Sequence, residues 1–177
     1  MPKPLQRAER GTGRTRALVR RGTRSDRSPL VVRKEPLGGG PTICPGCGAV
    51  YRDKTWRRPS VRRALALSGR AEPRQCPACK QVGRRTAFGR IAIPDLPAHR
   101  EEAVRQRIAN VVERARFTQP EHRLVEIRRV GDGLEVLTTS QKLAHRVAHE
   151  LVKAFHGRAT YHWSEDDGSL SARWVPA

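Results

Sequence analysis

The chain has 177 residues and a formal net charge of +19 at pH 7, with 36 lysines and arginines against 17 aspartates and glutamates. No apolar run approaches the roughly 18 residues needed to span a bilayer, and the N-terminus lacks the apolar core of a secretory signal. All four cysteines have metal-ligand spacing, which fits a reducing compartment. We therefore expect a cytoplasmic protein without a membrane partner.

The positive charge is concentrated in the first half of the chain. Residues 1–40 hold 11 basic and 3 acidic residues, residues 41–90 hold 12 and 2, and residues 91–177 hold 13 and 12. Basic blocks of this kind usually bind nucleic acid, because neutralised phosphates release their counterions. A membrane surface is the alternative, but no amphipathic stripe or lipidation signal accompanies the charge.

Residues 1–41 are predicted to form a disordered basic arm. The segment is rich in Arg, Gly, Ser and Thr and holds few apolar residues, so it buries too little surface to offset the entropy of ordering. Two interpretations fit: a solubilising tail, or an arm that becomes ordered on RNA. The density of arginine favours the arm.

Residues 42–90 are predicted to be a zinc-binding module. The pairs Cys44/Cys47 and Cys76/Cys79 are two matching C-x-x-C knuckles, and four thiolates are the tetrahedral set that structural zinc prefers. Gly48 suits a tight turn after the first pair. A redox role is the alternative, but no thioredoxin-like βαβ pattern surrounds either pair. The interval of 28 residues between the pairs is longer than the usual interval of about 15–20.

The interval between the knuckles combines arginines with aromatic residues, which allows base stacking beside phosphate neutralisation. A short helix is expected from Ser60 to Leu67, ended by Gly69. Trp56 either stacks on a base or covers a small zinc core, and both interpretations are open. The predicted nucleic-acid contacts of the module are Arg52, Lys54, Trp56, Arg57, Arg58, Arg62, Arg63, Arg84 and Arg85.

Residues 91–177 are predicted to form one compact α+β domain. Apolar residues at helical spacing predict a helix from Ala98 to Phe117. Strands are expected at 122–130 and 134–139, joined by a Gly-Asp-Gly turn. A second helix is capped by Ser140 and ends at Phe155. Strands at 159–163 and 169–175 complete the order α-β-β-α-β-β.

Two side-chain sets in this domain have more than one interpretation. The second helix carries a basic stripe, which either faces solvent or contacts RNA; Lys142 and Arg146 are its candidate RNA contacts. Tyr161, Trp163 and Trp174 occupy alternating strand positions. We expect all three rings to lie in the core under the helices rather than to form a stacking platform.

No catalytic constellation stands out in the sequence. His145 and His149 are four residues apart, but they lack the glutamate of an H-E-x-x-H metal site. A zinc ion with four cysteine ligands has no open position for hydrolysis. A binding protein is therefore favoured over an enzyme, and no small-molecule substrate is expected.

The segments CPGCGAVY and CPACK, with a tryptophan between them, resemble the zinc module of small bacterial NMD-type proteins. Those proteins are relatives of the N-terminal part of the archaeal and eukaryotic Nmd-three large-subunit export adaptor. The segments PAHREEAVRQRIANVVERA and SLSARW agree, and the strand-then-helix passage over 133–155 is the most telling. The resemblance covers about residues 43–175.

This resemblance implies a fold with a zinc ribbon, with the four cysteines as zinc ligands, and association with ribosomal RNA on the large subunit. The adaptor has further cysteine pairs and domains that this chain lacks, so nuclear export is not implied. Assembly, hibernation and decay all fit. A DNA-binding or transcription-associated zinc ribbon is the alternative function, and an RNA-modifying or RNA-degrading enzyme is a third.

Overall fold

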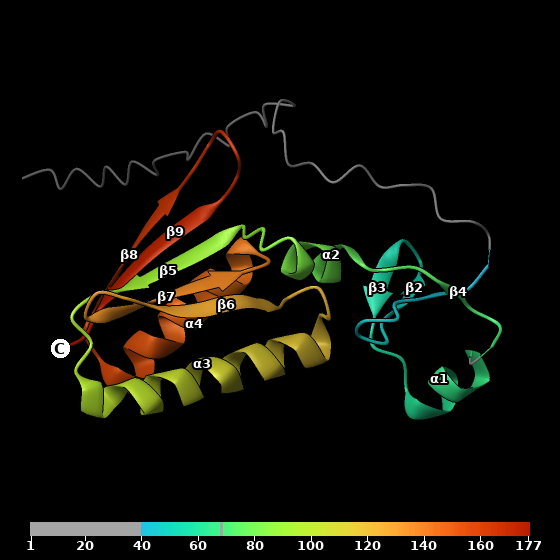
Figure 1. Cartoon of the computed structure of the whole chain (residues 1–177), viewed down its shortest axis with the longest axis horizontal. Coiled ribbons are helices and arrows are strands. Elements are labelled where there is room, and N and C mark those ends of the chain that lie inside the picture. Colours follow the sequence, from blue (N-terminus) through green and yellow to red (C-terminus); the bar gives the residue numbers. More distant parts are fainter. Residues whose placement is uncertain (1–39, 68) are drawn as a thin grey trace, which may run out of the picture.

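A computed structural model describes residues 40–67 and 69–177 (Figure 1). The predicted basic arm lies outside the described residues except for Gly40 and Pro41. The described part of the chain contains four helices and two sheets, which confirms the predicted α+β class. Within these residues no helix is both long enough and apolar enough to cross a membrane.

The metal module is built from very short elements. Its four-stranded sheet has the order β3-β2-β1-β4, formed by Thr42–Ile43 (β1), Val50–Arg52 (β2), Thr55–Arg57 (β3) and Glu72–Pro73 (β4). Helix α1 spans Val61–Leu67, where a helix is predicted, and α2 spans Pro77–Gly83. Elements of this length bury little surface, so the module needs another source of stability.

The hairpin between β2 and β3 is not predicted from the sequence. Its two turn residues, Asp53 and Lys54, have φ angles of 50° and 61°. A two-residue turn with both φ angles positive is the type I′ turn, for which Asn-Gly is the usual sequence signal. Asp-Lys gives no such signal, so this hairpin depends on the surrounding sheet.

The second unit has the predicted order of elements, preceded by one additional strand. Strand β5 spans Gly89–Ile93 and crosses the predicted boundary between residues 90 and 91. The other elements are Ala98–Thr118 (α3), Leu124–Val130 (β6), Gly133–Thr138 (β7), Gln141–Phe155 (α4), Arg158–Trp163 (β8) and Leu170–Val175 (β9).

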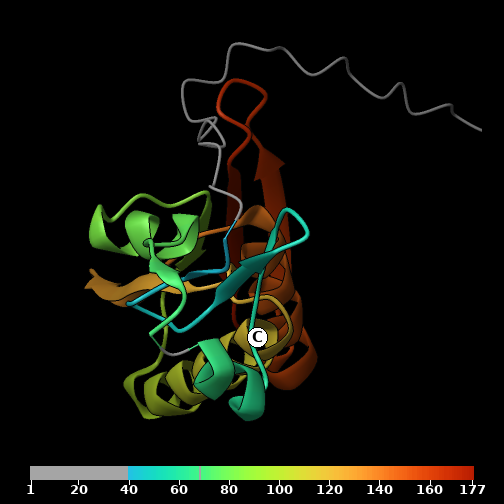
Figure 2. The same ribbon diagram turned by 90° about the vertical axis from the view of Figure 1, so that its right-hand side faces the viewer.

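The strand missed by the sequence analysis is the centre of the sheet. The strand order is β6-β7-β5-β9-β8, and β5 pairs antiparallel with β7 and parallel with β9. Helices α3 and α4 lie side by side on one face of this sheet, as Figures 1 and 2 show. The opposite face carries no helix among the described residues.

The hydrophobic core lies between that helical layer and the sheet. Ser140 caps α4 as predicted, because its hydroxyl oxygen accepts a hydrogen bond from the backbone N–H of Leu143 at 3.2 Å. Both helices turn one apolar stripe toward the strands. The core includes Val104, Ile108, Val111, Leu143, Val147 and Leu151 of the helices and Ile91, Ile93, Val136, Leu170 and Trp174 of the strands.

The prediction for the three strand aromatics is correct for Trp174 and wrong for the other two. Trp174 is fully buried, whereas Tyr161 and Trp163 are 37% and 51% exposed. The β8–β9 register places all three on the same face of the sheet, because Trp174 pairs with Ala159 in β8, two residues before Tyr161. However, β8 is the edge strand of the sheet, so the helical layer leaves Tyr161 and Trp163 partly exposed. The neighbouring strand β9 lies further inside, and the helical layer covers Trp174 completely.

Candidate metal centre

The four cysteines converge on one point, as their spacing predicts. Their sulfur atoms all lie within 4.8 Å of one another, and the Cys47 and Cys76 sulfurs are 3.7 Å apart. A tetrahedral ion with sulfur ligands at about 2.3 Å separates those sulfurs by about 3.8 Å. The four thiols therefore fit a tetrahedral metal ion.

The first knuckle is a tight turn closed by backbone hydrogen bonds. The Gly48 N–H donates to the Cys44 carbonyl at 2.8 Å, and the Cys44 N–H donates to the Ala49 carbonyl at 2.8 Å. Gly48 has a φ of 70°, which confirms the predicted need for glycine there. A β-carbon at Gly46 would lie 3.2 Å from the Cys79 sulfur, so a side chain at this position would crowd the site.

The second knuckle is the beginning of helix α2. Cys76 is the N-cap of that helix, and its sulfur accepts the Cys79 N–H at 3.4 Å. Pro77 occupies the first helical turn, where its missing N–H costs nothing. The Cys76 N–H donates to the Cys44 sulfur at 3.3 Å, which ties the second knuckle to the first. These amides stabilise negative charge on the sulfurs.

Burial and backbone amides act on the thiols in opposite directions. Burial raises the pKa of Cys79 to about 11 and also raises the pKa of Cys76. Burial acts on Cys44 too, but amides of the two knuckles outweigh it and lower the pKa of that thiol to about 7. Metal binding must therefore displace protons from at least the two thiols with raised pKa values, and affinity falls as the pH falls.

The cysteines make up most of the module's small core. Cys44, Cys76 and Cys79 are buried together with Ala49 and Ala78, and Cys47 and Trp56 pack against them. Trp56 therefore covers the cysteine cluster, and its ring lies 5.4 Å from that of Tyr51. Four thiolates in such a shell are typical of a structural metal site with no position left for a substrate.

No protein-family model matches the chain, and no curated protein sequence matches it. The metal centre and the charge around it are therefore the observations from which a function is inferred.

One residue at this site was missed by the sequence analysis. Arg123, just before β6, donates from Nη1 to the Cys79 sulfur at 3.1 Å. Its backbone is fixed by Thr139, whose hydroxyl oxygen accepts the Arg123 N–H at 2.9 Å. An arginine that belongs to the second unit thus contacts a predicted metal ligand of the first. Nothing near position 123 in the sequence signals this contact, because the two residues are 44 positions apart.

A second contact joins the two units nearby. The Arg58 guanidinium lies over the Phe117 ring, 5.2 Å from its centre, near the end of α3. In Figure 1, α2 lies between the rest of the metal module and the five-stranded sheet. The metal module is therefore attached to the second unit beside its metal centre.

Replacing Arg123 with methionine is expected to lower zinc affinity roughly tenfold. Outer hydrogen bonds of this kind typically contribute ten- to a hundredfold to metal affinity, because they orient a ligand and stabilise its charge. Competition with a chromophoric chelator measures the change. The Arg123→Lys variant should lose less zinc affinity than the Arg123→Met variant. The Arg158→Met variant, which is changed at an exposed position on β8, should bind zinc as tightly as the wild type. Equal affinity of the Arg123→Met variant and the wild type would show that the contact does not support the metal.

The predicted nucleic-acid contacts fall into two groups. All ten basic residues among them are exposed, and those between residues 52 and 85 belong to the metal module. Lys142 and Arg146 lie on α4, close enough to His122 to lower its pKa further, although burial is the main cause of that shift. His122 precedes Arg123, so these two α4 residues lie near the end of the second unit that meets the metal module.

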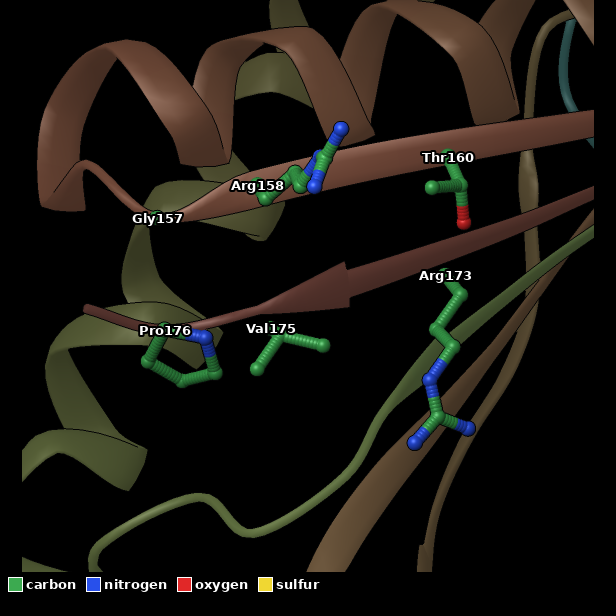
Figure 3. Close-up of a pocket in the computed structure, with 6 residues that line it drawn as sticks. All are labelled: Gly157, Arg158, Thr160, Arg173, Val175 and Pro176. Atoms are coloured by element: carbon green, nitrogen blue, oxygen red, sulfur yellow. The ribbon is translucent and has the colours of Figure 1, made fainter.

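A pocket of about 390 Å³ opens on the helix-free face of the sheet (Figure 3). Arg158 and Thr160 reach it from β8, and Arg173 and Val175 from β9, with Gly157 and Pro176 at its end. No carboxylate, thiol or imidazole lines it, so it offers no acid–base pair.

Proposed function

We propose that this is a zinc-containing RNA-binding protein without catalytic activity that associates with the ribosome. It binds ribosomal RNA on the large subunit and acts in assembly, hibernation or another form of translation-related control. The observation that carries this proposal is the excess of exposed arginines on a module folded around four thiols.

Zinc is the metal that fits the donor set best. Thiolates are soft ligands, and four of them in a tetrahedron favour zinc over the hard cations magnesium and calcium. The buried, fully protein-coordinated arrangement suits a structural role. The ion then contributes the folding free energy that the small cluster around Ala49 and Ala78 does not supply.

Most arginines of the metal module form no ion pair with the described residues. Its only two carboxylates, Asp53 and Glu72, pair with Arg52 and Arg74, each at 3.3 Å. Within residues 40–67 and 69–177, no ion pair is formed by Arg57, Arg62 or Arg63. Positive charge that the protein does not neutralise itself is available to phosphates.

The second unit uses its arginines in the opposite way. Many of its charges form ion pairs within the unit, and those charges are less available to a polyanion. Three carboxylates each bridge two arginines: Glu101 binds Arg105 and Arg129, Glu150 binds Arg107 and Arg114, and Glu135 binds Arg90 and Arg128.

The metal supports recognition because it stabilises the small sheet that carries Arg57, whereas helix α1 buries no residue. Arg57 ends strand β3, and Arg62 and Arg63 lie in the first turn of α1. A guanidinium on a rigid element makes bidentate phosphate contacts at a smaller entropic cost than one on a flexible chain. The choice of the ribosome among RNA partners rests on the resemblance to the NMD-type zinc proteins.

The experiment that tests the proposed function is sedimentation of the full chain through a gradient with purified ribosomal particles. The protein should migrate with large subunits at near-physiological salt and not with small subunits. Association with DNA of equal phosphate concentration instead would favour the transcription-associated alternative. Hydrolysis or modification of RNA by the zinc-loaded protein would contradict the non-catalytic assignment.

RNA binding is expected to weaken steeply with salt. If five of the exposed basic groups meet phosphates, log affinity should fall against log salt with a slope of roughly −3.5 to −4.5. Fluorescence anisotropy with a ribosomal RNA fragment, measured across a salt series, gives the slope. A slope near zero would mean that the basic half of the chain only keeps the protein soluble.

A further inference from the structure

Two aromatic side chains lie exposed on the edge of the five-stranded sheet. Tyr161 and Trp163 are two residues apart on β8, so both project from the same face of that strand. Their exposed fractions are 37% and 51%. Trp174, on the same face of the neighbouring strand, is fully buried. The core is therefore closed without the two outer rings.

Helix α4 provides an imidazole and positive charge beside these rings. The His145 ring lies 4.7 Å from the Tyr161 ring, at an angle of 32° between the planes. Lys142 and His149 precede and follow His145 by about one helical turn and are exposed. Three rings and a cation thus lie along one border between helix and strand, and no ion pair neutralises the lysine among the described residues.

The turn after Trp163 has the opposite charge. Glu165 and Asp166 are exposed there, and the Asp167 carboxylate accepts the Ser169 N–H at 2.8 Å. A polyanion would be repelled from this turn and attracted to α4. Phosphates are therefore attracted to the helical border of this surface, and the apolar rings lie on the strand.

We infer that Tyr161, Trp163 and His145 form a stacking platform for the bases of single-stranded nucleic acid, with phosphates directed toward Lys142 and His149. Exposed aromatic rings beside cations are the combination by which proteins hold unpaired bases, since every base has a face to stack. The outer edge of β8 pairs with no strand in the described chain, so an extended strand has access to it. This inference rests on the proposed RNA-binding function and assigns it a second contact surface, on the second unit.

The test compares the full zinc-loaded chain with two double variants. Tyr161→Ala with Trp163→Ala removes both rings, whereas Tyr161→Phe with Trp163→Phe keeps an aromatic ring at each position. Each protein is titrated with a single-stranded oligoribonucleotide and with a duplex of the same length, because paired bases have no free faces. Circular dichroism and zinc content verify that the variants are folded.

The alanine variant should bind the single strand at least about tenfold more weakly than the wild type, with less than about a twofold change for the duplex. The phenylalanine variant should remain within a few-fold of the wild type. Unchanged single-strand affinity of the alanine variant would overturn the platform, and salt-dependent binding to ribosomal particles would still uphold the proposed function.

Two other outcomes would assign the surface to a different occupant. A concentration-dependent dimer of the wild type that the alanine variant loses would mean that a second copy covers the rings. Single-strand affinity that rises after removal of residues 1–39, and that no longer depends on the rings, would assign the surface to that segment. Either result overturns the inference.

Discussion

A Cys76→Ser variant is expected to lose its zinc and to unfold residues 42–83, while residues 89–175 stay folded. The serine hydroxyl is a poor replacement for a thiolate, and zinc affinity should fall at least about a hundredfold. The metal module has only a small core around its cysteines, whereas the second unit has a large apolar core of its own. Loss of the metal therefore acts on one unit.

Elemental analysis and hydrogen exchange measure this result. The wild type should hold one zinc per chain, and the amides of β1 to β4 and α2 should lose protection in the variant while those of α3 and α4 keep it. Gln75→Ser, one residue away and exposed, is the matched control and should behave as the wild type. One zinc bound by the Cys76→Ser variant at unchanged affinity would contradict the four-thiolate site.

Reversing the charge of Arg57, Arg62 and Arg63 to glutamate is expected to reduce RNA affinity at least about a hundredfold. The three exposed side chains have no acidic partner in the described chain, so their replacement leaves the module's own ion pairs intact and adds repulsion from phosphates. Arg58 is left unchanged because its guanidinium packs on Phe117. Co-sedimentation with ribosomal particles and anisotropy with an RNA fragment measure the loss.

A second triple variant with the same change in net charge separates local from overall electrostatics. Lys153→Glu, Arg158→Glu and Arg173→Glu alter exposed residues of the other unit and should weaken binding far less. Deletion of residues 1–40 should lower affinity but keep the choice of particle, because it removes 11 basic and 3 acidic residues and leaves the metal module unchanged. If the deletion abolishes association and the Arg57, Arg62 and Arg63 reversal preserves it, the metal module does not recognise the RNA.

Local patterns in the sequence determined much of this structure. The spacing of the two C-x-x-C pairs identified the four cysteines whose sulfurs the structure brings together, because each knuckle brings two sulfurs together by its own turn. Helices α3 and α4 followed from apolar residues at helical spacing, and the cap at Ser140 followed from its hydroxyl. Each of these features depends on residues close together in the chain.

Features that depend on distant residues were decided only by the tertiary structure. The five residues of β5 are too short a segment to stand out, and the strand is stabilised by pairing with β7 and β9, about 45 and 80 residues away. The contact of Arg123 with Cys79 likewise joins two folding units and leaves no local pattern. Sheet order and contacts between units are therefore beyond what spacing and periodicity specify.

Alternation along a strand determines which face a side chain takes, but not how deep that face is buried. Tyr161, Trp163 and Trp174 alternate in the same way, and the sequence alone placed all three in the core. The sheet order puts β9 beside the central strand and β8 at the edge, so the helical layer covers Trp174 and leaves the other two rings in contact with solvent. The cysteine cluster was thus specified by local sequence, and the exposure of the two outer rings by the position of one strand in the sheet.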